Sequence, residues 1–173
     1  MATTTGEIEA ADGAVGHDGV ETQEPIGVPV EVDRVLLAVA DDTHDRVRNV
    51  ALSMAATHGA TVDALSVIPM DVSVDHWDMV VERRESAAEA VLDAAGAAAD
   101  AASVPLHKRL RYGTPAEEIS LYADGNDVDL IVVGEPNRTG LRRFFSPKNV
   151  ASDVRAATGV PVVSVPQVAE SAE

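Results

Sequence analysis

Short apolar runs alternate with helical patterns from Asp33 to Val165, and this alternation limits the possible folds more than any other feature of the chain. The run Val35–Val39 is continuous rather than alternating, which indicates a strand covered on both faces. The expected strands are Val35–Val39, Thr61–Ile68, Leu106–Tyr112, Val128–Val133 and Val160–Val165. Because a helical pattern separates each strand from the next, the sequence predicts an α/β fold: an open five-stranded parallel sheet with helices on both faces.

Capping and breaking residues place the helices between these strands. Asp42 or Thr43 can cap the first helix, and Gly59 should end it. The run Thr114-Pro115-Ala116-Glu117 is typical of a capping box with proline at the first helical position.

Two further helices are expected, a long one from about His76 to Ala102 and a short one from about Asn149 to Ala157. Helical spacing predicts the inward face of the long helix, which should carry Val80, Ala87, Val91, Ala94 and Ala98.

The charge of the chain divides it into segments. Residues 1–31 carry seven carboxylates and no Lys or Arg, and glycine and proline interrupt any periodicity there. We expect residues 1–31 to form an acidic disordered tail, residues 32–168 the α/β domain, and residues 169–173 a C-terminal tail. The acidic tail either only keeps the protein in solution or binds a partner.

The whole chain is strongly acidic. Its 173 residues carry 13 Lys and Arg against 29 Asp and Glu, a formal net charge of −16. Acid excess with little lysine indicates adaptation to concentrated salt, because the Debye length falls to about 3 Å at 1 M salt and self-repulsion is then screened. The alternative is an ordinary acidic protein.

The composition argues against several kinds of function and against a location in the membrane. Such a charge disfavours general electrostatic binding to nucleic acid or to anionic membranes. Cysteine is absent, which removes disulfides and thiolate chemistry. No apolar run approaches the roughly 20 residues of a membrane span, and residues 1–7 lack the features of a signal peptide, so we expect a cytoplasmic protein.

One segment departs from the acidic background. Between Pro136 and Ser152 lie four cations, Arg138, Arg142, Arg143 and Lys148, and no carboxylate. The segment follows the strand that reaches Gly134, and a strand that opens onto donors and cations is a common way to hold an anion. The alternative is that these cations pair with the acidic surface or with a second subunit.

Catalytic and metal chemistry have no comparable pattern. The five histidines are scattered without ligand spacing, and no serine has a histidine and an acid arranged to activate it. Asp41, Asp42 and Asp45 are better explained as helix-capping acids than as a metal cluster. We therefore predict no metal site and no enzymatic activity, although slow nucleotide hydrolysis is not excluded.

Several short motifs together resemble the universal stress protein family. They occur in the order of that family and span about residues 33 to 166. The motifs are Gly59-Ala60, Gly113-Thr114-Pro115-Ala116-Glu117, Asp129-Leu130-Ile131-Val132-Val133-Gly134, Arg138-Thr139-Gly140-Leu141 and Val160-Pro161-Val162-Val163-Ser164-Val165. The resemblance implies the strand order 3-2-1-4-5, a homodimer, and ATP bound between the first and fourth strands.

The resemblance also implies a set of nucleotide-binding residues. ATP-binding members carry a glycine, two residues, a second glycine, nine residues, and then Gly-Ser or Gly-Thr. Gly134 fits the first position, but Asn137 stands at the second glycine and Pro136 precedes it. The candidate site consists of Asp41, Val67, Val133, Gly134, Asn137, Arg138, Gly140, Lys148, Asn149 and Val150.

These observations favour a regulatory protein that binds ATP, another adenine nucleotide or another small anion weakly. The alternative is a dimeric interaction module of the same fold that binds no nucleotide. In either case the last strand should lie at a sheet edge and carry the homodimer contact, through Val160, Val162, Val163 and Val165.

Overall fold

The computed structural model describes residues 31–70, 77–135 and 149–167 of the chain. The strands are β1 (Arg34–Val39), β2 (Thr61–Ile68), β3 (Leu106–Tyr112), β4 (Leu130–Glu135) and β5 (Val162–Pro166). The helices are α1 (Asp45–His58), α2 (Trp77–Ala102), α3 (Pro115–Gly125) and α4 (Val150–Ala157). All strand pairs are parallel and the order is β3-β2-β1-β4-β5, which confirms the predicted sheet.

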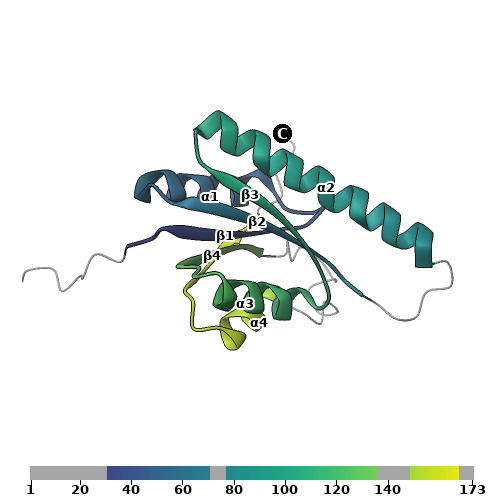
Figure 1. Ribbon diagram of the computed structural model, residues 1–173. Coiled ribbons are helices and arrows are strands. Elements are labelled where there is room, and N and C mark those ends of the chain that lie inside the picture. Colours follow the sequence, from purple (N-terminus) through teal and green to yellow (C-terminus); the bar gives the residue numbers. More distant parts are fainter. Residues whose placement is uncertain (1–30, 71–76, 136–148, 168–173) are drawn as a thin grey trace, which may run out of the picture. The chain divides into compact units, whose positions relative to one another are not determined.

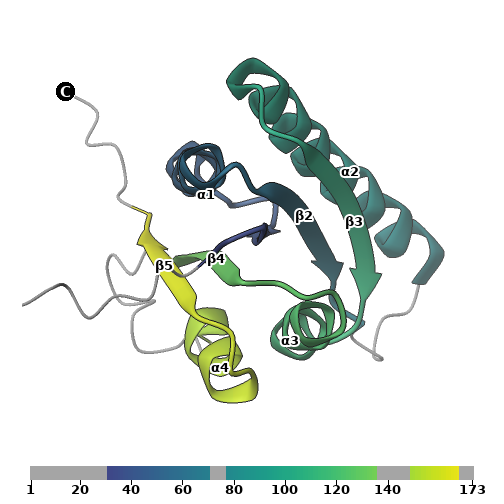
Figure 2. The ribbon, with the colours of Figure 1, turned by 60° about the vertical axis from the view of Figure 1, so that its left-hand side comes forward.

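Two helical layers cover the sheet. Helices α1 and α2 lie on one face, and α3 and α4 lie on the other (Figures 1 and 2). Leu37 and Val132 are fully buried under the first layer, whereas Leu36 and Ile131 are fully buried under the second. Successive strand residues therefore enter opposite cores, which explains why the central strands are continuous apolar runs.

The last two strands start two residues later than predicted. Val128 is buried, but its N–H donates to the carbonyl of Ala123 and so completes the end of α3 rather than joining the sheet. The strand β4 instead continues through Gly134, which pairs with Val165 of β5. A glycine expected to end the strand thus lies inside it.

The cap of α1 also differs from the prediction. His44 is the N-cap, and its Nδ1 accepts a hydrogen bond from Arg46 N at 3.4 Å. Thr43 Oγ1 instead accepts from Ala40 N at 2.7 Å, which closes the turn after β1. Gly59 ends the helix as predicted, with a left-handed φ of 68° that favours glycine.

Thr114 stands at the N-cap of α3 and Pro115 at its start, as predicted. However, the threonine side chain makes no capping hydrogen bond, so the expected capping box does not form.

The buried face of α2 agrees only in part with the predicted one. Val91 and Ala98 pack partly buried against the core, as predicted. Ala88, Leu92, Ala95 and Ala99 are buried, while Ala94 is exposed. On the exposed side, Lys108 of β3 reaches across Gly96 to pair with Asp93 at 2.7 Å. Alanines occur on several faces of this helix, so periodicity alone does not define its rotation.

A buried polar cluster lies beneath α3. Asp63 of β2 is fully buried; its carboxylate accepts a hydrogen bond from Tyr122 OH at 3.0 Å and lies 3.1 Å from His107 Nδ1. Arg34 forms an ion pair with it at 3.6 Å, and Arg109 Nε donates to the tyrosine oxygen at 3.1 Å. Burial raises the pKa of Tyr122 above its usual value.

Within the described residues, no helix combines the length and the apolar character that crossing a bilayer requires.

Candidate functional site

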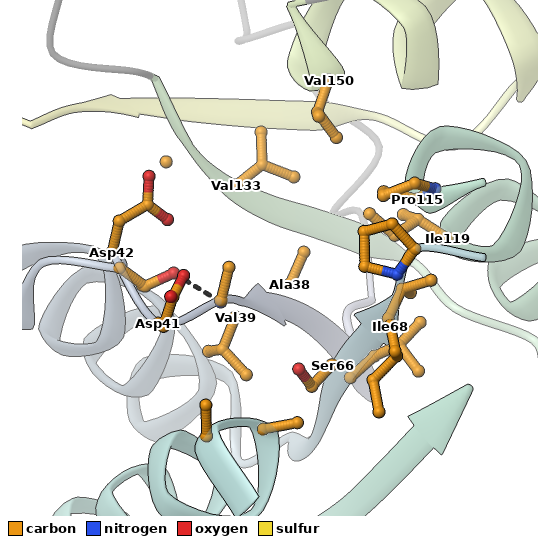
Figure 3. Close-up of a pocket in the computed structure, with 18 of the residues that line it drawn as sticks. Ala38, Val39, Asp41, Asp42, Ser66, Ile68, Pro115, Ile119, Val133 and Val150 are labelled. Atoms are coloured by element: carbon orange, nitrogen blue, oxygen red, sulfur yellow. Dashed lines mark hydrogen bonds between the residues drawn. The ribbon is translucent and has the colours of Figure 1, made fainter. Parts of the chain in front are cut away.

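A cavity of about 510 Å³ lies at the carboxyl ends of β1 and β2, beside β4 (Figure 3). Parallel α/β sheets bind ligands at this end, where the chain turns to opposite faces on either side of β1. The lining residues come from three strands, the helices α2, α3 and α4, and the residue that follows β5. The fold therefore gathers segments that are distant in the sequence around one cavity.

One side of the cavity is acidic. Asp41 and Asp42 form the turn that joins β1 to α1, and both line the cavity (Figure 3). Thr43 Oγ1 closes this turn by accepting a hydrogen bond from Ala40 N. Because the threonine makes this bond, neither carboxylate is needed to close the turn, and both remain available to a ligand. Carboxylates accept hydrogen bonds from hydroxyl and amine groups, and they repel an unaccompanied anion.

The opposite side is apolar. Ile68, Pro115, Ile119, Val133 and Val150 face the cavity there (Figure 3). Pro115 and Val150 are the first residues of α3 and α4, so both helices begin at the wall of the cavity. A planar, mostly apolar group such as a nucleobase fits this side, and helix N-termini favour negative charge nearby.

Gly134 fills a tight position between the sheet and α1. A Cβ atom at this residue would lie 2.6 Å from Gln167 Nε2 and 3.2 Å from Val47 Cγ2. Gln167 in turn accepts a hydrogen bond from His44 N at 2.8 Å through its Oε1. A side chain at this position would therefore displace the amide of Gln167.

Comparison with known proteins decides the family. The model of the universal stress protein family matches residues 31–166. The chain belongs to the universal stress protein family. It is also 25% identical over 129 residues to the universal stress protein MJ0531 of Methanocaldococcus jannaschii, which covers 75% of this chain and 74% of that protein.

Solved structures of universal stress proteins share the fold. A universal stress protein in complex with cAMP is 20% identical, with a TM-score of 0.62 over 78% of this chain and 97% of that chain. The universal stress protein from Archaeoglobus fulgidus in complex with dAMP is 21% identical, with a TM-score of 0.55 over 78% of this chain and 98% of that chain.

The structure brings half of the predicted site residues of this universal stress protein together. Asp41, Val67, Val133, Gly134 and Val150 all line the cavity. Asn149 lies next to it as the N-cap of α4, where its Oδ1 accepts from Ser152 N at 3.4 Å. The other predicted residues, which lie outside the described part of the chain, are Asn137, Arg138, Gly140 and Lys148.

Five polar lining residues are absent from the candidate site predicted from the sequence: Asp42 and Thr43, which were expected as helix caps, and Ser66, Arg84 and Gln167. Ser66 lies at the end of β2, and Gln167 directly follows β5, so the rule that ligands gather at the carboxyl ends of strands could have suggested both. Arg84 lies on α2 and donates to the carbonyl of Pro69 at 2.7 Å. Only the packing of that helix against the sheet brings it to the cavity.

Among residues 31–70, 77–135 and 149–167, no group of three or more His, Asp or Glu side chains could hold a metal ion.

Proposed function

We propose that this universal stress protein is a regulatory protein that binds an adenine nucleotide, weakly, in the cavity between β1 and β4. The observation that supports the proposal most is the division of the cavity into an apolar side and an acidic side. A nucleoside has the matching division, because its base is planar and largely apolar and its ribose carries hydroxyl donors. The complexes of related proteins with cAMP and dAMP support the same ligand class.

The two sides suggest an orientation for the ligand. The base would pack between Val133, Ile119 and Val150, and the ribose hydroxyls would donate to Asp41. The phosphates would then point toward the segment that follows Glu135, whose four cations match their charge.

Weak binding follows from the sequence of that segment. Pro136 removes a backbone donor, Asn137 prevents the close approach that glycine allows, and Glu135 adds a negative charge. Each lost bond to a charged group is worth roughly 1.5–3 kcal/mol, so two losses weaken phosphate binding by about 100-fold or more.

Titration of the full chain in high salt tests this function. We expect AMP and ATP to bind with dissociation constants of about 1 mM, measured by NMR chemical shifts. Asp41→Ala should weaken AMP binding but not phosphate binding, because it removes an acceptor for the ribose and a charge that repels anions. Asp100→Ala, which removes an exposed carboxylate of α2, serves as the control.

Micromolar ATP binding would contradict the predicted weakness, and equal effects of Asp41→Ala and Asp100→Ala would contradict the orientation. If neither nucleotide nor phosphate binds, the interaction module becomes the better description.

We also propose that the protein is a homodimer through β5. This strand pairs only with β4 and so forms one edge of the sheet, as predicted. It carries Val162 and Val163, both half-buried, whereas the opposite edge strand β3 carries Lys108, Arg109 and Arg111. Cations on an edge strand oppose further pairing, and a valine-rich edge favours it, so a second copy fits the β5 edge.

Substitution at β5 tests the dimer. Sedimentation in high salt should show a dimer for the wild type and a monomer for Val163→Lys, because the lysine places a charge in the proposed contact. Ala97→Lys adds the same charge to an exposed position of α2 and should leave the dimer intact. A monomeric wild type would refute the proposal, and a thermal melt of Val163→Lys shows whether the variant is folded.

A further inference from the structure

Gln167 has a fixed orientation at the edge of the cavity. Its Oε1 lies 2.8 Å from the backbone nitrogen of His44, at the start of α1. A backbone N–H can only donate, so the oxygen of the carboxamide must face it and the NH₂ group must face the other way. The hydrogen bond therefore settles which end of the amide points where.

The NH₂ group lies against Gly134. Gln167 Nε2 is 2.6 Å from the position that a Cβ atom of Gly134 would occupy, and both residues line the cavity. The described residues offer this NH₂ group no acceptor, although the side chain is half-buried. Arg48 Nε is the only buried side-chain polar atom without a partner in the described residues, so the NH₂ group of Gln167 is open to solvent. A donor held in one orientation at the wall of a cavity can exchange water for an acceptor on a ligand.

We infer that Gln167 is a specificity-determining residue whose NH₂ group donates to an oxygen of the ribose-phosphate part of the ligand. The inference rests on the proposed function. Its position supports this part of the nucleotide rather than the base, because Gln167 is bonded to His44 N, two residues after Asp42. The acidic turn at Asp41 and Asp42 lies on the side of the cavity away from Pro115 and Ile119 (Figure 3).

Gln167 also follows β5 directly, and its amide joins the end of that edge strand to the start of α1. The same side chain would therefore position the acidic turn and contact the ligand. A test must separate these two roles.

Two substitutions make that separation. Gln167→Glu keeps an oxygen that can accept from His44 N but replaces the donor with a negative charge, whereas Gln167→Ala removes both. Asn49→Asp makes the same amide-to-carboxylate change at an exposed position of α1 outside the cavity. The readouts are the dissociation constants of AMP and adenosine and the hydrogen exchange of the His44 amide.

We expect both Gln167 variants to bind AMP about tenfold or more weakly, while Asn49→Asp binds like the wild type. The His44 amide should stay protected in Gln167→Glu and exchange faster in Gln167→Ala. A loss seen for AMP alone in both variants places the acceptor on the phosphate, and an equal loss for adenosine places it on the ribose; both support the inference. A loss of AMP binding in Gln167→Glu alone reflects repulsion by the new carboxylate and contradicts it.

If Gln167→Glu binds AMP as well as the wild type, Gln167 only caps α1 and the inference is wrong while the proposed function stands. If the wild type binds neither AMP nor adenosine, the proposed function fails and the inference falls with it.

Discussion

Replacing Asp63 with alanine should lower the free energy of unfolding by about 3 kcal/mol, measured by urea denaturation. The carboxylate is fully buried, and it accepts a hydrogen bond from the hydroxyl group of Tyr122, a residue that is only 3% exposed. Alanine would leave that hydroxyl without its acceptor and would open a void between β2 and α3. Arg34 and His107 are partly exposed and can turn to water, so their loss of a partner costs less.

Two further variants test the cause of that loss. Asp93→Ala removes the carboxylate of an ion pair with Lys108 in which both side chains are largely exposed, and it should change stability by less than about 1 kcal/mol. In a Tyr122→Phe background, Asp63→Ala should cost less than in the wild type, since the orphaned hydroxyl is then absent. If Asp63→Ala lowers the free energy of unfolding equally in both backgrounds, the lost bond to Tyr122 is not the cause of the destabilisation.

The strands were predictable from the sequence because most of them are short, nearly continuous apolar runs. Val35–Val39 is a continuous apolar run buried on both faces, so its type could be read directly from the sequence, although β1 begins one residue earlier, at Arg34. Thr61–Ile68 and Leu106–Tyr112 are confirmed to the residue. Val128 was wrongly predicted to start a strand because it is apolar and buried. Its N–H bonds to the end of α3 and not to the sheet.

Helix rotation and capping were less predictable. In α2, residues such as Ala94 and Ala95 are equally small, so the sequence leaves the buried face open and contacts with β2 and β3 decide it. At α1, Thr43 could have served either as a cap or in the turn. The turn uses it, and His44 takes the cap.

The candidate site also has residues that the sequence predicts and residues that only tertiary contacts reveal. Asp41 and Gly134 follow from the rule that ligands bind where parallel strands end. The same rule could have placed Gln167 near the cavity, but only the structure shows that its amide lies between α1 and Gly134. The role proposed for Gln167 depends on three segments that meet only in the folded chain.

The thermal midpoint should rise by at least about 10 °C between low salt and molar potassium chloride. The net charge of −16 repels itself in the compact state, and shortening the Debye length from about 10 Å at 0.1 M salt to about 3 Å at 1 M removes most of that repulsion. A chain that lacks residues 1–31 loses seven carboxylates, so its midpoint should rise less but still rise.

Charge substitution separates screening from a general effect of salt on the protein surface. Glu82 and Glu89 are exposed on α2, and changing both to lysine replaces two negative charges with positive ones without disturbing the buried face of the helix. If screening is the cause, this variant should be more stable than the wild type at low salt and should gain less from added salt. If its midpoint rises as steeply as that of the wild type, salt acts by strengthening the burial of apolar surface instead, and the acidic composition has no bearing on stability.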